Sequence, residues 1–206
     1  RNKEKNKEVI AEIEKLGRKG LSISADLSNV STIPDVVDEV IEAFGALHIL
    51  VNNAGMSVTK FALDITEEDW DNVVDLNLKT VFFFSQAAAK KMKEQNYGKI
   101  INVASVVGQV GDVGISPYTA SKGGVINLTR TLALEWARFG IQVNAIGPAY
   151  IETDLNREQL KVPKVREKII SKTPMGRLGQ PEELEGAILL LASDAGSFIT
   201  GQTIFV

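Results

Sequence analysis

The order of its predicted elements limits the fold of this chain more than any other feature of its sequence. Short apolar runs, expected to form strands, lie at 21–25, 48–53, 98–105, 141–146 and 202–206. Between them the apolar residues recur at helical spacing, with helices expected near 9–17, 31–44, 66–94, 118–139, 163–171 and 181–192. Strands that alternate with helices predict an α/β fold, a doubly wound parallel sheet between two helical layers.

Several of the expected helices carry their own start or stop signals. Ser31 is positioned to cap the helix that follows it, and Thr66 with Asp69 resembles a capping box. The first helix would bury a stripe made of Val9, Ile10, Ile13 and Leu16, and Gly17 would end it. The most irregular stretch, 147–181, is a candidate mobile loop over a binding site.

Composition excludes several classes of function. The chain has 206 residues and 44% of them are hydrophobic, which suits one domain with a substantial core. A net charge of −3 gives no electrostatic reason to expect nucleic acid or an anionic membrane as partner. No apolar run approaches the ~20 residues that span a bilayer, and the charged start is unlike a signal peptide. We therefore expect a cytoplasmic protein.

The scarcity of cysteine and histidine argues against a zinc site and against a Ser-His hydrolase. The chain has no cysteine and one histidine, His48, which opens an expected strand and is interpreted as structural. Without cysteine there is no thiolate catalysis or Cys-ligated zinc, and a Ser-His hydrolase would need a histidine near its serine. We expect no metal site.

The stretch "SPYTASKGG" places Tyr118 four residues before Lys122. On a helix these positions share one face, so the ammonium group can lie near the phenol. A cation there lowers the pKa of a tyrosine, which is ordinarily ~10, and makes it usable as a general acid or base. A surface pair without function would show the same spacing.

Two further stretches converge on the same region. Ser105 ends an expected strand, and "NNAG" (52–55) ends another, with Ala54 and Gly55 allowing a ligand close to the backbone. In open parallel sheets ligands bind outside the carboxyl ends of the strands. Ser105 and Tyr118 can therefore face one crevice.

Together, "NNAG", "SVVG", Tyr118-x-x-x-Lys122 and "GPAYIETDL" resemble the short-chain dehydrogenases/reductases along the whole chain. The resemblance implies a Rossmann-like fold and hydride transfer between a nicotinamide cofactor and a carbonyl or secondary alcohol. By similarity, Tyr118 is the general acid/base, Ser105 orients the substrate oxygen, and Lys122 lowers the tyrosine pKa and holds the nicotinamide ribose. Asn77, in "DLNL", matches the asparagine that anchors a water in the proton relay.

The resemblance also implies cofactor contacts. They fall on Arg1, Asp26, Leu27, Asn52, Ala54, Gly55, Tyr118, Lys122, Pro148, Ile151 and Thr153. Pro148-Ala149 stands where the family usually has Pro-Gly, for which we expect only slight local adjustment. Arg1 would lie beside the adenosine ribose, where a guanidinium accommodates a 2′-phosphate. We therefore expect NADP(H), with NAD(H) as the alternative.

Part of the family pattern is missing. The family begins with a strand, a Gly-x-x-x-Gly-x-Gly turn, a helix and a second strand, none of which is present, and its usual acidic-glycine ending is also absent. We count five strands where the family has seven. We interpret residues 1–206 as one dinucleotide-binding domain, incomplete at both ends, from a longer protein.

The sequence identifies the substrate less clearly than it identifies the family. "LALEWARFGIQVNAIGP" resembles the branch of gluconate 5-dehydrogenase and related sugar-acid or polyol enzymes, whereas "IETDL" resembles 3-oxoacyl-(acyl-carrier-protein) reductases equally. A non-catalytic dinucleotide-binding relative is a further alternative. We also expect a homotetramer, because the expected helices carry more apolar residues than one core-facing stripe needs: Phe82, Phe83, Phe84, Ala87, Ala88 and Ala89.

Overall fold

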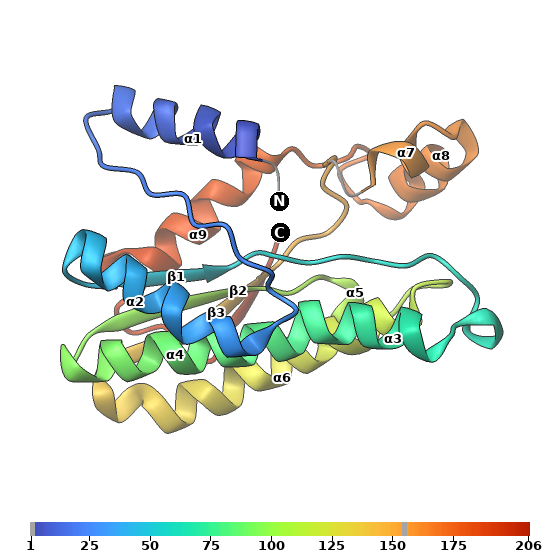
Figure 1. Cartoon of the computed structure of the whole chain (residues 1–206). Helices are drawn as coiled ribbons and strands as arrows, with labels where there is room; N and C mark the ends of the chain where they lie inside the picture. Colours follow the sequence, from blue (N-terminus) through green and yellow to red (C-terminus); the bar gives the residue numbers. More distant parts are fainter. Residues whose placement is uncertain (1–2, 154–155) are drawn as a thin grey trace.

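The centre of the molecule is a parallel sheet of four short strands. The computed structural model describes residues 3–153 and 156–206 (Figure 1). Its strands are β1 (Ile49–Asn52), β2 (Gly98–Val103), β3 (Ile141–Gly147) and β4 (Thr203–Phe205), in the order β1-β2-β3-β4. Each pair of neighbours is parallel. The α/β architecture and four of the five expected strands are therefore confirmed.

The strand expected at 21–25 is not formed. In Figure 1 these residues run as an extended connection between the first two helices, with no ladder to another strand. A strand exists only where a neighbour offers free N–H and C=O groups. Within the described residues, β1 pairs only with β2, and its Ile49 and Val51 stay 42% and 41% exposed. The prediction of a strand here was wrong because no strand of the described chain pairs with it; its described neighbour is helix α1, whose Asn6 side chain donates a 3.0 Å hydrogen bond to Ser22.

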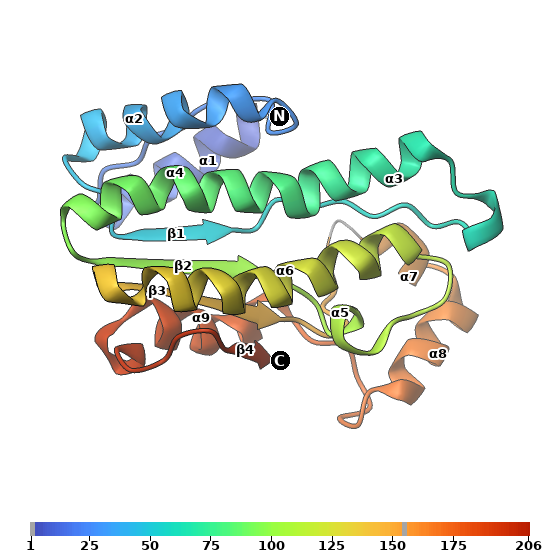
Figure 2. The same cartoon turned by 90° about the horizontal axis from the view of Figure 1, so that it is seen from below.

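Helices cover both faces of the sheet. α4 (Thr80–Glu94) and α6 (Ser116–Trp136) lie side by side on one face, as Figure 2 shows, and α9 (Glu185–Ala192) packs on the other. Neighbouring strand residues point to opposite faces. Accordingly, Ile100 packs with the α4 and α6 side, and Ile101 packs with Leu191 of α9.

Two alanines of α4 belong to this core. Ala88 and Ala89 are 0% and 7% exposed and pack against β2 and β3 residues. They were expected to be part of an oligomer surface, which was wrong for these two residues. The helix faces the sheet with its small side chains, which lets it approach the strands closely.

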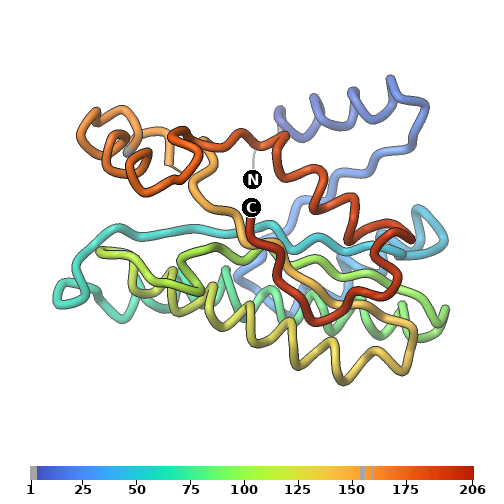
Figure 3. Tube along the Cα trace, turned by 180° about the vertical axis from the view of Figure 1, so that it is seen from behind, coloured from blue at the N-terminus to red at the C-terminus, as the bar shows by residue number. Residues whose placement is uncertain are grey.

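The first helix, α1 (Lys3–Lys15), stands apart from the strands on the α9 side (Figures 1 and 3). Val9 and Leu16, predicted to be on its buried stripe, are 53% and 80% exposed. Gly17 ends the helix with a φ of +72°, in the left-handed region that glycine adopts most easily. The stop signal is thus confirmed, but the stripe is buried only in part.

The second helix starts differently from the prediction. α2 (Ile33–Phe44) follows a 3-10 turn, Val30–Thr32, and Ser31 lies inside that turn. Asn29 caps this turn, because its side chain accepts a hydrogen bond from the Ser31 backbone N–H, and Thr32, the N-cap of α2 itself, makes no capping bond with its side chain. The predicted Ser31 cap was therefore wrong, because the short turn moves the cap two residues earlier.

The segment 66–94 is a helix with a widened turn. α3 (Glu67–Val74) begins with the predicted capping box of Thr66 and Asp69. A π-helical turn, Asp75–Lys79, then joins it to α4. Such a turn inserts one extra residue into the helical repeat and often marks a functional site.

Three short helices, α5 (Val107–Val110), α7 (Arg157–Leu160) and α8 (Pro163–Lys172), follow the carboxyl ends of β2 and β3. The 3-10 turns Ala62–Asp64 and Pro181–Leu184 belong to the connections that follow β1 and β3. The turns Ala137–Phe139 and Asp194–Gly196 lie at the opposite end of the sheet, beside the start of β3. Among the helices of the described residues, none is both long and apolar enough to cross a membrane.

Candidate active site

Tyr118 and Lys122 lie one turn apart on α6, as the spacing predicts. The Lys122 Nζ is 5.6 Å from the centre of the Tyr118 ring. The lysine is 4% exposed, and its Nζ donates a hydrogen bond of 2.6 Å to the Val103 carbonyl at the end of β2. Burial lowers the pKa of the Lys122 ammonium to about 8, so it carries its charge at neutral pH.

Ser105 lies two residues after the end of β2 and is 8% exposed. Its Oγ is 3.4 Å from the Pro148 carbonyl and accepts a weak hydrogen bond, also 3.4 Å, from the Val107 N–H. Burial raises the pKa of the Tyr118 phenol, and a side-chain hydrogen bond with Ser105 acts in the opposite direction. Ser105 and Tyr118 therefore meet, as expected from the strand-end argument.

These groups line a cavity of about 490 Å³ at the carboxyl end of the sheet. Seven of the predicted site residues border it: Gly55, Ser105, Tyr118, Lys122, Pro148, Ile151 and Thr153. The volume lies within the range typical of small-molecule sites. The irregular stretch after β3 forms one wall of the cavity, as expected for a binding loop, with Pro148, Ala149, Tyr150, Ile151, Thr153 and Asn156.

A close approach of two backbones places Lys122 in this cavity. Helix α5 packs on α6 at Gly108 and Gly123. A Cβ added at Gly108 would lie 2.7 Å from the Lys122 carbonyl carbon and 2.8 Å from the Gly123 nitrogen. No side chain fits at Gly108, and a Cβ at Gly123 would lie 3.2 Å from the Gly108 carbonyl oxygen, so the absence of side chains here lets the loop after Ser105 lie close to α6.

Asn77 is fully buried in the π-helical turn. Its side chain accepts a 2.9 Å hydrogen bond from the Met56 N–H, and donates one of 2.9 Å to the Met56 carbonyl and one of 3.2 Å to Ser121. A Cβ added at Gly55 would lie 3.3 Å from Asn77 Oδ1 and 3.6 Å from Lys122 Nζ. Asn77 thus fixes the "NNAG" loop beside the lysine.

The Asn52 side chain lies in a buried hydrogen-bond network. Its Nδ2 donates hydrogen bonds to Asn102 Oδ1 (2.9 Å) and Ser85 Oγ (3.0 Å), and Asn102 Nδ2 donates to Thr129 Oγ1 (3.0 Å). This buried network joins β1 and β2 to α4 and α6. The Asn52 side chain is therefore structural, and Asn53, the next residue, lines the cavity instead.

The other predicted cofactor contacts are not among the cavity residues. The Asp26 carboxylate accepts bonds from the backbone and hydroxyl of Ser28, and the Leu27 carbonyl accepts one from Thr80. Ala54 is exposed and does not border the cavity. Arg1 lies outside the described residues. Ala149 does not adopt a positive φ, since Asn96 alone does so among the described non-glycine residues.

Several cavity residues were not singled out from the sequence. Asn53, Ser57, Tyr150 and Asn156 line it. The Asn156 side chain bonds the Ile151 carbonyl (2.8 Å) and the Thr153 N–H (3.0 Å), which orders the loop. Asn53 and Tyr150 lie inside the motifs "NNAG" and "GPAYIETDL", so position in a motif was the signal available.

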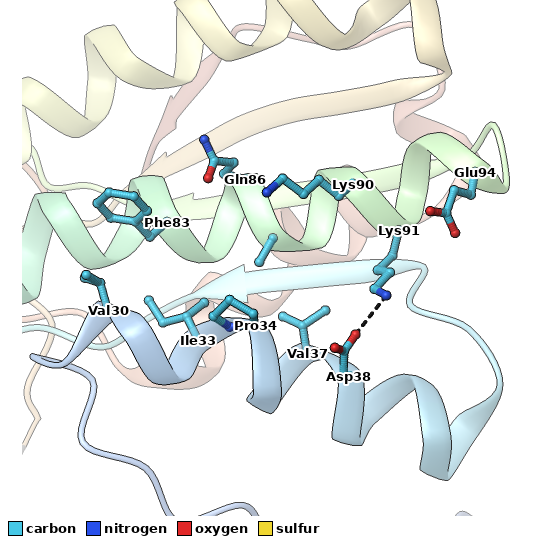
Figure 4. A pocket seen from close by; sticks show the side chains of 11 residues that line it. Val30, Ile33, Pro34, Val37, Asp38, Phe83, Gln86, Lys90, Lys91 and Glu94 are labelled. Carbon is cyan, nitrogen blue, oxygen red and sulfur yellow. Dashed lines mark ion pairs between the residues drawn. The ribbon is translucent and has the colours of Figure 1, made fainter.

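A second hollow, of about 280 Å³, lies between α2 and α4 (Figure 4). Ile33 and Phe83 form part of its apolar floor, and Lys91 pairs with Asp38 across it at 2.8 Å. It contains none of the predicted site residues and lies along the helices rather than at the strand ends. The candidate catalytic residues Ser105, Tyr118 and Lys122 all line the first cavity.

Comparison with known proteins identifies the family. A family model described as enoyl-(acyl carrier protein) reductase matches residues 1–206. A 2-dehydro-3-deoxy-D-gluconate 5-dehydrogenase of Escherichia coli is 46% identical over 201 residues, covering 97% of this chain and 79% of that protein. The chain belongs to the short-chain dehydrogenase/reductase family.

Other members of the family are similar in sequence and structure. A 3-oxoacyl-(acyl-carrier-protein) reductase of Staphylococcus aureus is 39% identical over 205 residues, covering all of this chain and 82% of that protein. A crystal structure of a gluconate 5-dehydrogenase from Burkholderia cenocepacia, in complex with NADP and tartrate, superposes with a TM-score of 0.95 at 37% identity. It is matched over 100% of this chain and 81% of that one. The fold is thus the Rossmann-like fold of short-chain dehydrogenases/reductases.

Proposed function

We propose that this member of the family transfers a hydride between a nicotinamide cofactor and the carbonyl or secondary alcohol of a small substrate. The observation that carries the proposal is the convergence of Ser105, Tyr118 and Lys122 on one cavity. A non-catalytic relative would not need a buried ammonium group beside a buried phenol, because burying a charge costs free energy.

The residues present fit the nicotinamide end of such a cofactor. Lys122 and Tyr118 would hold its ribose, and Ile151 and Thr153 would meet its carboxamide and phosphates. Gly55 supports this fit, because the missing Cβ leaves the backbone close to the lysine amine without filling the cavity. When bound, the cofactor supplies or accepts the hydride.

The chain's own groups handle the proton and the substrate oxygen. The Ser105 hydroxyl holds that oxygen, and the Tyr118 hydroxyl gives it a proton in reduction or takes one in oxidation. Burial raises the pKa of the Tyr118 phenol and the hydrogen bond with Ser105 opposes that effect, while the charged Lys122 would favour the phenolate during proton transfer. Asn77 holds the loop that borders the lysine and would anchor the water of the proton relay.

The substrate we favour is a sugar acid or polyol, because two of the similar proteins carry the names of gluconate-type dehydrogenases. Reduction of 3-oxoacyl groups on acyl-carrier protein is the second candidate, favoured by the similarity to the reductase of Staphylococcus aureus. We place the enzyme in the cytoplasm.

NADP(H) is the proposed cofactor, since the gluconate 5-dehydrogenase of similar structure was crystallised with NADP. The guanidinium group of Arg1 would bind the 2′-phosphate through two of its N–H donors. An Arg1→Ala variant should then raise the KM for NADPH far more than that for NADH. Equal losses with both cofactors would remove Arg1 from this role.

We further propose a homotetramer, with α4 and α6 at a subunit interface. Phe82 and Phe83 stay partly exposed and meet edge to face at 5.2 Å, and Leu134 on α6 is 84% exposed. Sedimentation of the intact protein tests this proposal, and a monomer at micromolar concentration would contradict it.

The activity is tested with the intact protein and a panel of substrates. D-gluconate and cyclohexanol are offered with NADP⁺ and NAD⁺, and acetoacetyl-coenzyme A with NADPH and NADH, while absorbance of the reduced nicotinamide is followed. We expect turnover with D-gluconate and NADP⁺. The absence of turnover with all of them, from a folded protein that binds no cofactor by calorimetry, would contradict the proposed function.

A further inference from the structure

Tyr150 lines the cavity from the loop after β3, and its hydroxyl group is hydrogen-bonded to another side chain. It donates a hydrogen bond to Asp112 Oδ2, in the glycine-rich loop before α6. The Asp112 Oδ1 accepts a 2.8 Å bond from the Val113 N–H and lies 3.6 Å from Lys172 Nζ, at the end of α8. One carboxylate thus joins the two loops that line the cavity, with Tyr150 and Ile115, to the end of α8.

The Tyr150 backbone is fixed as well. Its carbonyl accepts a 3.0 Å hydrogen bond from the Gly179 N–H, and Ile151 forms a parallel bridge with Gly179. Two residues earlier in the chain, the Pro148 carbonyl lies 3.4 Å from Ser105 Oγ. The ring is therefore held at a set position near the group that would orient the substrate oxygen.

The protonation state of the pair follows from its surroundings. Burial and the neighbouring carboxylate raise the pKa of the Tyr150 phenol, and the hydrogen bond from Tyr150 lowers the pKa of Asp112. The phenol stays neutral and the carboxylate ionised. Since the single phenol hydrogen is used on Asp112, the oxygen can only accept a hydrogen bond from anything in the cavity.

We propose that Tyr150, held by Asp112, is a specificity-determining residue that accepts a hydrogen bond from a second hydroxyl group of the substrate. The inference rests on the proposed function and narrows it to polyhydroxylated substrates. A hydrocarbon chain at this position would leave the phenol oxygen without a donor, which costs free energy when water is excluded.

The test compares one polyhydroxylated and one monofunctional alcohol, D-gluconate and cyclohexanol, with NADP⁺ and the intact protein. Tyr150→Phe should raise the KM for D-gluconate about five- to tenfold, the usual worth of one hydrogen bond. Its kcat should stay within about twofold, and kcat/KM for cyclohexanol should not fall. Tyr97→Phe is the matched control, because Tyr97 packs edge to face on His48 and does not border the cavity.

Two variants of Asp112 test the same proposal without changing Tyr150 itself. Asp112→Asn retains an acceptor for the phenol and should keep most of the preference for D-gluconate. Asp112→Leu frees the phenol hydrogen and should lose the preference. Equal changes for both alcohols in Tyr150→Phe, or a parent that prefers acetoacetyl-coenzyme A, would overturn the inference and leave the oxidoreductase proposal standing. A parent inactive on every probe would instead contradict the proposed function.

Discussion

The Lys122 ammonium nitrogen lies 5.6 Å from the centre of the Tyr118 ring, one turn further along the same helix. A helix fixes that separation more firmly than a loop would, since both Cα atoms belong to one hydrogen-bonded repeat. The 2.6 Å bond from Lys122 to the Val103 carbonyl also ties the pair to the end of β2. The spacing of these two side chains is therefore set by regular structure.

Removal of the Tyr118 hydroxyl should abolish turnover and leave the fold intact. Tyr118→Phe keeps the ring that packs in the cavity but has no proton to give or take, and we expect a loss of ~10²–10⁴ in kcat. Steady-state kinetics and circular dichroism measure the two effects. Turnover within a few-fold of the parent would show that another group carries the proton.

Burial of Lys122 should give the stability of the protein a recognisable pH dependence. In the folded state the pKa is about 8, whereas the ordinary value is 10.5. Between these values the unfolded chain binds the proton and the folded chain does not, so the free energy of unfolding rises with pH across this window.

In Lys122→Met this contribution is absent. Between pH 7.5 and 10.5, the free energy of unfolding of the parent minus that of the variant should rise by on the order of 3 kcal/mol. Urea denaturation at several pH values measures the difference. Parallel curves for the two proteins would mean that the lysine keeps its ordinary pKa when folded.

Asn77 should matter to stability as well as to any proton relay. Asn77→Ala leaves the Met56 N–H and carbonyl without their partner, so we expect a loss of ~2–4 kcal/mol. Asn72→Ala, at an exposed position of α3, is the matched control and should change stability little. A variant that unfolds like the parent but has lost turnover would assign Asn77 to the relay alone.

Substitution of the two adjacent asparagines at the end of β1 should have different effects, one on stability and the other on cofactor binding. Asn52→Ala removes the donor to Asn102 and Ser85 and should destabilise the protein by ~1–3 kcal/mol. Asn53→Ala should raise the KM for the cofactor and change stability by less than ~0.5 kcal/mol. Denaturation and kinetics of both variants decide, and the reverse pattern would contradict the placement of these side chains.

Local patterns predicted most of the fold. The apolar runs of β2 and β3 and the capping box at Thr66 are encoded within a few residues, and all three are confirmed. The segment at 21–25 has the composition of a strand, but a strand also needs a neighbour, which the segment itself does not specify. The Ser31 cap failed for a similar reason, since Asn29 two residues earlier is an equally good acceptor.

The site residues also fall into those that local patterns predicted and those that they did not. Tyr118, Lys122 and Ser105 were found because spacing on one helix and position after a strand are both visible in the sequence. Asn52 and Asn53 differ by one position, and which of them faces the cavity depends on how β1 is oriented in the sheet. The contact of Tyr150 with Asp112 joins residues 38 positions apart, and no local pattern indicates it.

The packing of Gly108 against Gly123 has a consequence for anyone who wants to redesign the cavity of this protein. Neither residue has a functional group, yet any larger side chain at Gly108 would push against the Lys122 backbone. A library for new specificities should leave these two positions unchanged and vary Ile115, Tyr150 and Leu184, whose side chains border the cavity from three different segments. In evolutionary terms, substitutions at these three positions would change which substrate fits the cavity while the spacing of Ser105, Tyr118 and Lys122 remained the same.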